Sequence, residues 1–398
     1  IMKITKLVIR SLSGHFESDG EFWEERLVRP IDIYPEYANE KHENWSLQKN
    51  NNVSTNSIFV EIHTDENIYG TAGPIDSLQA DVIEKSLSKI LIDKDPLAIE
   101  LLWDQMHRIS VHGRQGITMM AISAIDCALW DLKGKFYKTP VYKILGGPTR
   151  KEVPAYASML GFNVTDMGLV RERSQQFKEQ GFTAQKWFFR YGPMSGHEGL
   201  NKNIEMVKTL RESLGEDYEI MLDCWQSMDY KYIIRLAKNI EEYRPYWLEE
   251  TVMNDRVEIY KKIKDKISIP LSGAEHDYTR WGMLRFIEKK ALDFLQPDIY
   301  WAGGLSEVLK ISNLATTYDL ITIPHGHSSN ASLHFSLSQV PIHTPYQEFL
   351  IKWNKVHQHF LKTPEIPEKG FFSITELNGL GMELDSDKIE KEEKLEIK

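Results

Sequence analysis

The chain has 398 residues, of which 41% are apolar and 27% charged, a composition typical of a globular protein and not of a disordered one. Its formal net charge of −10 argues against nucleic-acid and anionic-membrane partners, because both require a basic surface. We find no apolar run long enough to span a membrane and no signal-peptide core. Cys127 and Cys224 lie in apolar contexts, so we expect two buried free thiols and a reducing, cytoplasmic location.

Residues 1–150 mix strand and helix patterns and form the first expected domain. Strands are predicted at 3–10 and 57–63, and helices at 78–92, 96–108 and 117–136. Residues 13–56 form a long polar segment without a clear period, and we interpret it as a functional loop or lid. Gly146-Gly147-Pro148 marks the domain boundary.

From residue 151 onward, short apolar strands alternate with amphipathic helices. The predicted strands are 152–158, 184–189, 219–225, 246–250, 267–273, 291–297, 320–325 and 346–350. Eight such units favour a closed parallel barrel over an open sheet. We assign 151–362 to this barrel and 363–398 to a C-terminal segment that returns to the first domain. Its Lys/Glu-rich end is interpreted as a solvated face or a frayed terminus.

Ionisable residues stand at seven consecutive predicted strand ends, where barrels of this class carry their chemistry. They are Lys186, Asp223, Glu249 or Glu250, Glu275, Asp298, His325 and Glu348. Carboxylates on three adjacent strands repel one another unless a cation neutralises them. An all-oxygen set suits Mg²⁺, with Mn²⁺ as the alternative and Zn²⁺ disfavoured. A network of structural salt bridges is the competing interpretation.

Asp298 and His325 fall on neighbouring strands, and a carboxylate bonded to one imidazole nitrogen raises the basicity of the other. This pair is therefore a candidate general base. His327 lies two residues after His325, so a His-x-His metal site is an alternative, although a weaker one. His276, beside Glu275, could be a second acid or a supporting group.

Several ordered motifs carry a resemblance to a known family. They are Met221-Leu222-Asp223-Cys224-Trp225, Trp247-Leu248-Glu249-Glu250, Gln296-Pro297-Asp298, Pro324-His325-Gly326, Tyr191-Gly192-Pro193, Gly303-Gly304-Leu305 and the stretch 140–147. Together with the strand-end residues, they resemble the mandelate racemase subgroup of the enolase superfamily over nearly the whole chain. Within that subgroup the sequence is most similar to the L-rhamnonate dehydratases and other acid-sugar dehydratases. The resemblance implies an α/β fold, a (β/α)₇β TIM-like barrel with an α+β N-terminal capping domain.

The resemblance also assigns roles to the strand-end residues. Asp223, Glu249 and Glu275 would bind Mg²⁺, Asp298 and His325 would form the catalytic dyad, and Glu348 would hydrogen-bond the substrate carboxylate. Many members carry Lys-x-Lys on the second barrel strand, with the second Lys as a base. Here the pattern is Lys186-Trp187-Phe188, which leaves Lys186 as a cation beside the substrate and removes the second base.

The expected reaction is dehydration of an aldonic acid to a 2-keto-3-deoxy acid, by removal of the proton next to the carboxylate and syn loss of the 3-hydroxyl. An L-rhamnonate-like substrate is favoured. The alternatives are an epimerase or cycloisomerase on the same scaffold, or a non-catalytic metal-binding regulator. We expect further substrate contacts from Arg26 and Arg29 on the lid, and from His276 and Trp301. A homo-oligomer with a role in carbohydrate catabolism is also expected.

Overall fold

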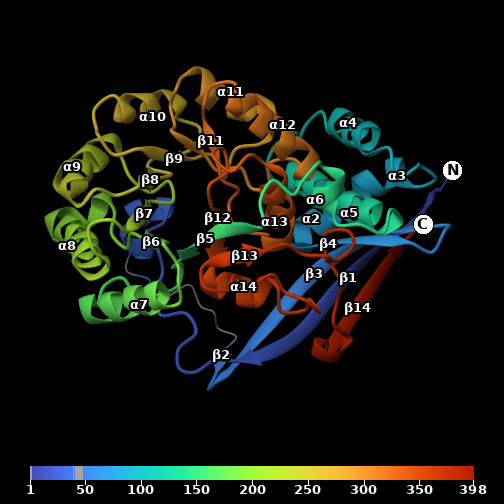
Figure 1. Cartoon of the computed structure of the whole chain (residues 1–398), viewed down its shortest axis with the longest axis horizontal. Coiled ribbons are helices and arrows are strands. Elements are labelled where there is room, and N and C mark those ends of the chain that lie inside the picture. Colours follow the sequence, from blue (N-terminus) through green and yellow to red (C-terminus); the bar gives the residue numbers. More distant parts are fainter. Residues whose placement is uncertain (1, 39, 41–47) are drawn as a thin grey trace.

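The computed structural model describes residues 2–38, 40 and 48–398. Strands from both ends of the chain form one five-stranded antiparallel sheet (Figure 1). Its strands are β1 (Ile4–Glu17), β2 (Gln48–Lys49), β3 (Asn52–Thr64), β4 (Tyr69–Ile75) and β14 (Lys391–Ile397). The order is β14-β1-β3-β2, and β4 pairs with β3. The sheet therefore ties the last residues of the chain to the first.

Helices cover one face of this capping sheet. They are α2 (Ser77–Val82), a π-helical turn (Ile83–Leu87), α3 (Ser88–Leu91), α4 (Ile99–Ile109) and α5 (Ile117–Phe136). The three helices predicted in this region are confirmed. The contact between α5 and β4 is close, because a Cβ on Gly70 would lie only 2.0 Å from the carbonyl oxygen of Ala128. Only glycine fits at that position.

The second unit is a barrel-like sheet of eight parallel strands, as predicted from the sequence, and its two end strands are not hydrogen-bonded to each other in the described ladder. The strands are β5 (Glu152–Ser158), β6 (Ala184–Phe188), β7 (Glu219–Asp223), β8 (Trp247–Glu249), β9 (Leu271–Gly273), β10 (Phe294–Leu295), β11 (Ile321–Thr322) and β12 (Gln347–Leu350). Seven helices connect them: α7 (Met167–Glu179), α8 (Gly196–Leu214), α9 (Tyr230–Ile240), α10 (Val257–Lys264), α11 (Thr279–Glu288), α12 (Gly304–Thr316) and α13 (Ser329–Ser338). The ladder runs β11-β10-β9-β8-β7-β6-β5-β12, which is the (β/α)₇β order.

An apolar plug fills the barrel below the site. Its buried members are Tyr156, Ala184, Met221, Trp247, Phe294 and Ile323. Because alternate residues of a strand point to the same side, the next inward position on β6, β7 and β8 is occupied by Lys186, Asp223 and Glu249. The charged residues therefore stand directly on a packed apolar floor, with the strands' C-terminal ends opening above them.

The polar segment between the first two strands is shorter than the sequence predicts. Residues 13–56 were expected to lack regular structure, but β1 continues to Glu17 and β3 begins at Asn52. The ladder continues through Ser13↔Asn56 and His15↔Ser54. Polar side chains obscure the alternation here, while the backbone hydrogen bonds are still made. The remaining loop contains η1 (Pro30–Ile33) and α1 (Pro35–Ala38).

The C-terminal segment passes through α14 (Ile351–His357) and β13 (Phe371–Ser373), which pairs with β5, before joining the capping sheet. The prediction of a frayed Lys/Glu-rich end is wrong, because Lys391–Ile397 forms strand β14 beside β1. Its side chains are largely exposed, as a solvated face requires. Ion pairs to β1 help to hold the strand, with Lys6 Nζ 2.7 Å from Glu396 and Arg10 Nε 2.5 Å from Glu392.

Both cysteines are buried and free, as predicted. Among the described residues, no helix combines the length and the apolar character that crossing a bilayer requires.

Candidate active site

Three carboxylates converge on one buried lysine at the mouth of the barrel. Lys186, on β6, is 1% exposed. Its Nζ lies 2.5 Å from Glu249 Oε1, 2.8 Å from Glu348 Oε1 and 3.2 Å from Asp223 Oδ2. The four residues come from β6, β7, β8 and β12, so the sequence-predicted strand ends do meet in space.

The two adjacent glutamates at the end of β8 point to different partners. Glu249 Oε2 accepts hydrogen bonds from Trp247 Nε1 at 2.9 Å and from Gln296 Nε2 at 3.0 Å. Glu250 adopts a positive φ of 43° and accepts from His276 Nδ1, which is 3.0 Å from each of its oxygens. Alternation along the strand therefore sends Glu249 to Lys186 and Glu250 toward the loop after β9.

The predicted dyad is assembled. His325 Nδ1 lies 2.7 Å from Asp298 Oδ2, and the other oxygen of Asp298 accepts the backbone N–H of Tyr300 at 2.7 Å. His325 Nε2 faces Glu275 Oε2 at 3.6 Å. The carboxylate thus fixes one ring nitrogen and leaves Nε2 directed at the acidic cluster, which is the orientation a general base requires.

Phe188 occupies the position of the second lysine of a Lys-x-Lys pair. Its ring lies two residues beyond Lys186 on β6, with its centroid 5.4 Å from Lys186 Nζ, and it is 5% exposed. Phe188 aligns with Asp223 in the parallel ladder. An aromatic hydrocarbon ring cannot accept a proton, so this strand offers no second base.

Burial and mutual repulsion set the electrostatics of the cluster. Burial raises the pKa of Asp223 to about 6 and that of Glu275 to about 7. Burial opposes protonation of His325, but Glu275 and the hydrogen bond to Asp298 outweigh it and raise its pKa to about 10. Burial likewise opposes protonation of His276, whereas Glu250 raises its pKa to about 9. The site therefore binds positive charge favourably.

The residues present fit a divalent cation. Glu275 Oε2 is buried and has no hydrogen-bond partner among the described residues. Glu250, Glu275 and His276 each offer a ligand atom within 4.8 Å of the others. Asp223 and Glu249 add carboxylate oxygens on the adjacent strands. A mainly oxygen donor set of this kind suits Mg²⁺.

The N-terminal loop lies over the strand ends, as a lid would. The backbone N–H of Glu24 donates to Gly161 O at 2.7 Å, and that of Val28 donates to Phe189 O at 2.8 Å. Ser227 Oγ donates to Val28 O at 3.2 Å. Because Gly161, Phe189 and Ser227 follow the neighbouring strands β5, β6 and β7 respectively, the loop is attached to one side of the barrel mouth at three consecutive strand ends.

Arg26 and Arg29 hold this loop together. Arg26 is 3% exposed and donates to Asp32 Oδ2 at 2.6 Å and to the carbonyls of Leu27, Tyr37, Ala38 and Glu40. Arg29 binds the same Asp32 at 3.1 Å and Glu40 at 2.8 Å. These contacts lie within the loop, so any effect of Arg26 on substrate must act through the shape of the lid.

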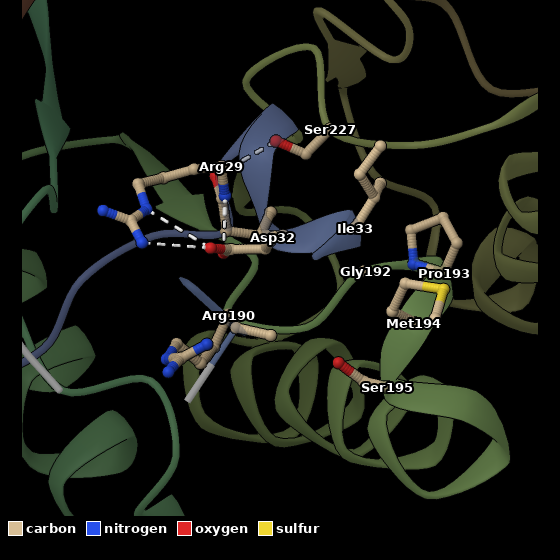
Figure 2. A pocket seen from close by; sticks show the side chains of 11 residues that line it. Arg29, Asp32, Ile33, Arg190, Gly192, Pro193, Met194, Ser195 and Ser227 are labelled. Atoms are coloured by element: carbon tan, nitrogen blue, oxygen red, sulfur yellow. Dashed lines mark hydrogen bonds and ion pairs between the residues drawn. The ribbon is translucent and has the colours of Figure 1, made fainter. Parts of the chain in front are cut away.

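Figure 2 shows the pocket that separates this arginine cluster from the barrel. Arg29, Asp32 and Ile33 lie on the lid side, and Arg190 and η3 (Pro193–Ser195) lie on the side of the loop after β6. Arg190 Nε contacts Glu25 at 3.2 Å, which links that loop to the lid a second time.

An aromatic side chain borders the dyad. The ring centroid of Trp301 lies 4.9 Å from that of His325, 5.3 Å from that of His276 and 5.4 Å from that of His327. The structure thus places the predicted substrate contacts Trp301 and His276 beside the proposed base. Burial lowers the pKa of His327 to about 3, which keeps its imidazole neutral.

Sequence reasoning missed the capping-domain residues that hold the loop after β10. Ser306 donates to Asp126 through its backbone N–H at 3.0 Å and its hydroxyl at 2.6 Å, and Trp103 Nε1 donates to Gly303 O at 2.7 Å. A Cβ on Gly304, whose φ is +84°, would lie 2.4 Å from the Asp126 side chain. The Gly303-Gly304 pair therefore allows the loop after β10 to pack closely against the capping domain. In the sequence, only the apolar surroundings of Asp126 within α5 indicated this contact.

Comparisons with known proteins agree with this geometry. Residues 43–146 match the family described as "Mandelate racemase / muconate lactonizing enzyme, N-terminal domain", and residues 169–388 match "Enolase C-terminal domain-like". An L-rhamnonate dehydratase from Saccharopolyspora erythraea is 31% identical over 96% of this chain and 97% of its own length.

Solved structures show the same relationship. Rhamnonate dehydratase from Gibberella zeae, crystallised in complex with Mg, has a TM-score of 0.81 at 29% identity, covering 96% of this chain and 95% of that one. The 3,6-anhydro-D-galactonate cycloisomerase from Zobellia galactanivorans has a TM-score of 0.78 at 27% identity, covering 98% of this chain and 100% of that one. The chain belongs to the enolase superfamily, with the N-terminal domain of the mandelate racemase and muconate lactonizing enzymes.

Proposed function

We propose that this chain is a hydro-lyase that dehydrates an aldonic acid to a 2-keto-3-deoxy acid, with Mg²⁺ as cofactor and an L-rhamnonate-like substrate favoured. The observation that carries the proposal is the Asp298–His325 pair at 2.7 Å, with Nε2 of the histidine directed at a cluster of carboxylates. The similarity to rhamnonate dehydratases supports the choice of substrate class.

Asp223, Glu249 and Glu275 are the proposed ligands of the cation. Glu250 is the competing ligand on β8, because it lies beside Glu275 and His276. When bound, Mg²⁺ supplies positive charge that stabilises a developing anion on the substrate carboxylate. The remaining contributions come from the side chains of the chain itself.

In its neutral form, His325 removes the proton on the carbon next to the substrate carboxylate; without a bound cation, the neighbouring carboxylates raise its pKa to about 10 and keep it protonated. Lys186 and Glu348, 2.8 Å apart, are proposed to face the substrate carboxylate, with Lys186 as the cation. Burial opposes ionisation of Glu348, but Lys186 and His325 outweigh it and lower its pKa, so Glu348 donates a hydrogen bond to the substrate only after it takes up a proton. The 3-hydroxyl then leaves as water, taking the proton that His325 had accepted. The resulting enol tautomerises to the 2-keto-3-deoxy acid. The net change is loss of one water molecule.

An epimerase needs a base on the opposite face of the substrate, and Phe188 occupies the second-lysine position on β6. The described β6 therefore supports a one-base elimination over an epimerisation. A cycloisomerase is the second candidate, because one has a TM-score of 0.78 to this chain. We place the enzyme in the cytoplasm, where its two free buried thiols would stay reduced.

The test is a screen of purified protein with Mg²⁺ against a library of six-carbon acid sugars, with detection of 2-keto acids. We expect a 2-keto-3-deoxy product from L-rhamnonate or a close stereoisomer. A cyclised isomer in place of a dehydrated product would identify a cycloisomerase. No turnover of any acid sugar would contradict the proposal.

A further inference from the structure

Strand β14 leaves one edge of the capping sheet unpaired. Its inner edge pairs with β1 from Leu7↔Ile397 to Ser13↔Lys391, and no described strand pairs with its outer edge (Figure 1). An unpaired edge presents backbone N–H and C=O groups that can template another strand. Lysine and glutamate on such an edge normally discourage pairing with unrelated strands.

The two faces of β14 differ in chemistry. Leu395 and Ile397 share a face with Ile9 and Leu7, and Leu395 is 43% exposed. The opposite face carries only charged residues: Glu392, Lys394, Glu396 and Lys398. Within the subunit, Lys394 contacts Glu392 at 3.3 Å, while Glu392 and Glu396 also pair with Arg10 and Lys6 on β1. The side chains of Lys394 and Lys398 are 53% and 76% exposed, so they can also contact glutamates of a second strand.

The charge order of the strand selects one antiparallel register with a second copy. When two copies of β14 pair as antiparallel neighbours, the two-fold axis between them runs perpendicular to the sheet. Residues that face each other then lie on the same face of the sheet, and the residue on the axis faces its own copy. When Leu395 lies on the axis, Lys394 faces Glu396 of the partner subunit and Glu392 faces Lys398 of the partner subunit. By symmetry this register makes four opposite-charge pairs.

Registers centred on any charged residue of the strand place like charges opposite each other. Centring the axis on Glu392, Glu393 or Glu396 puts two glutamates together, and centring it on Lys394 puts two lysines together. Like charges directly opposite in a sheet are destabilising. Centring the axis on Ile397 leaves two opposite-charge pairs, between Glu396 and Lys398 of the partner subunit, against four about Leu395, so Leu395 gives the most complementary register.

We propose that β14 is a homodimer interface, in which two copies join their five-stranded capping sheets into one continuous sheet through antiparallel β14 strands centred on Leu395. The apolar Leu395 and Ile397 side chains of the two copies then meet on one face. The charged pairs line the other face. The interface lies at the far edge of the capping sheet and does not involve the barrel mouth.

The first test is charge reversal in the full chain, with mass measured by sedimentation velocity across a dilution series. Lys394→Glu or Glu396→Lys turns two opposite-charge pairs into like-charge pairs, and each should raise the dimer dissociation constant by about tenfold or more. The double variant Lys394→Glu/Glu396→Lys restores opposite charges and should recover wild-type association. Turnover should be unchanged in the separated subunits.

The second test is disulfide trapping. Leu395→Cys should form a disulfide-linked dimer on mild oxidation, whereas Glu393→Cys, on the same face but off the axis, should not. The native thiols are buried and do not compete. A monomer at all concentrations, an oligomer whose mass Lys394→Glu leaves unchanged, or trapping through position 393 in place of 395 would overturn the proposal.

Discussion

Lys186→Met should destabilise the protein strongly in the absence of a divalent cation. Among the described residues, Lys186 is the only cation within ion-pair distance of Asp223, Glu249 and Glu348, at 3.2, 2.5 and 2.8 Å. All four side chains are at most 3% exposed. Methionine preserves the length and flexibility of the side chain but leaves the three carboxylates without an ion-pair partner. Breaking a buried ion pair in this way costs about 3–5 kcal/mol.

The assay is urea unfolding in EDTA, followed by the same titration in Mg²⁺. Lys202→Met is the matched control, because Lys202 pairs with Glu198 on the surface, where such a pair contributes about 0–1 kcal/mol. Mg²⁺ should recover part of the stability of Lys186→Met, since the cation restores positive charge to the cluster. A stability of Lys186→Met in EDTA within about 1 kcal/mol of the wild type would refute this electrostatic account.

Three further changes test the site and the lid. Asp223→Asn and Glu249→Gln should each weaken Mg²⁺ binding, measured by calorimetry, and abolish turnover, measured by product formation. Glu250→Gln should have a smaller effect on both. Full activity of the wild type in EDTA would contradict the metal assignment. His325→Asn should lower kcat by about 10²–10⁴-fold and stop exchange of the α-proton with D₂O, while persistent exchange would show that another base acts. Arg26→Ala should raise KM and reorder the preferred acid sugars by loosening the lid, and identical kinetics across the library would remove Arg26 from any role in recognition.

Strand periodicity and the cost of buried charge were enough to predict the barrel and its strand-end residues. Buried parallel strands are apolar, so Asp223, Asp298 and His325 stood out as exceptions that the structure brings to one mouth. The same reasoning could not choose between Glu249 and Glu250. Their directions depend on where β8 ends and on the positive φ of Glu250, which no local pattern specifies.

Other features depend on partners far away in the chain. The Lys/Glu-rich end has no apolar run to mark it as a strand, and only the ladder with β1 makes it one. Arg26 was predicted to contact substrate because a cation on a polar loop over a barrel mouth suits polyol hydroxyls or a second acidic group, but Asp32 and four carbonyls enclose it. These are tertiary contacts that composition and spacing do not encode.

Turnover of L-rhamnonate in D₂O with Mg²⁺, followed by NMR of substrate and product, tests the central claim most directly. The one-base arrangement, with His325 on one face and Phe188 at the second-lysine position, predicts a 2-keto-3-deoxy acid and no C2 epimer of the substrate. Accumulation of the C2 epimer would show a second base opposite His325 and would contradict the proposed mechanism.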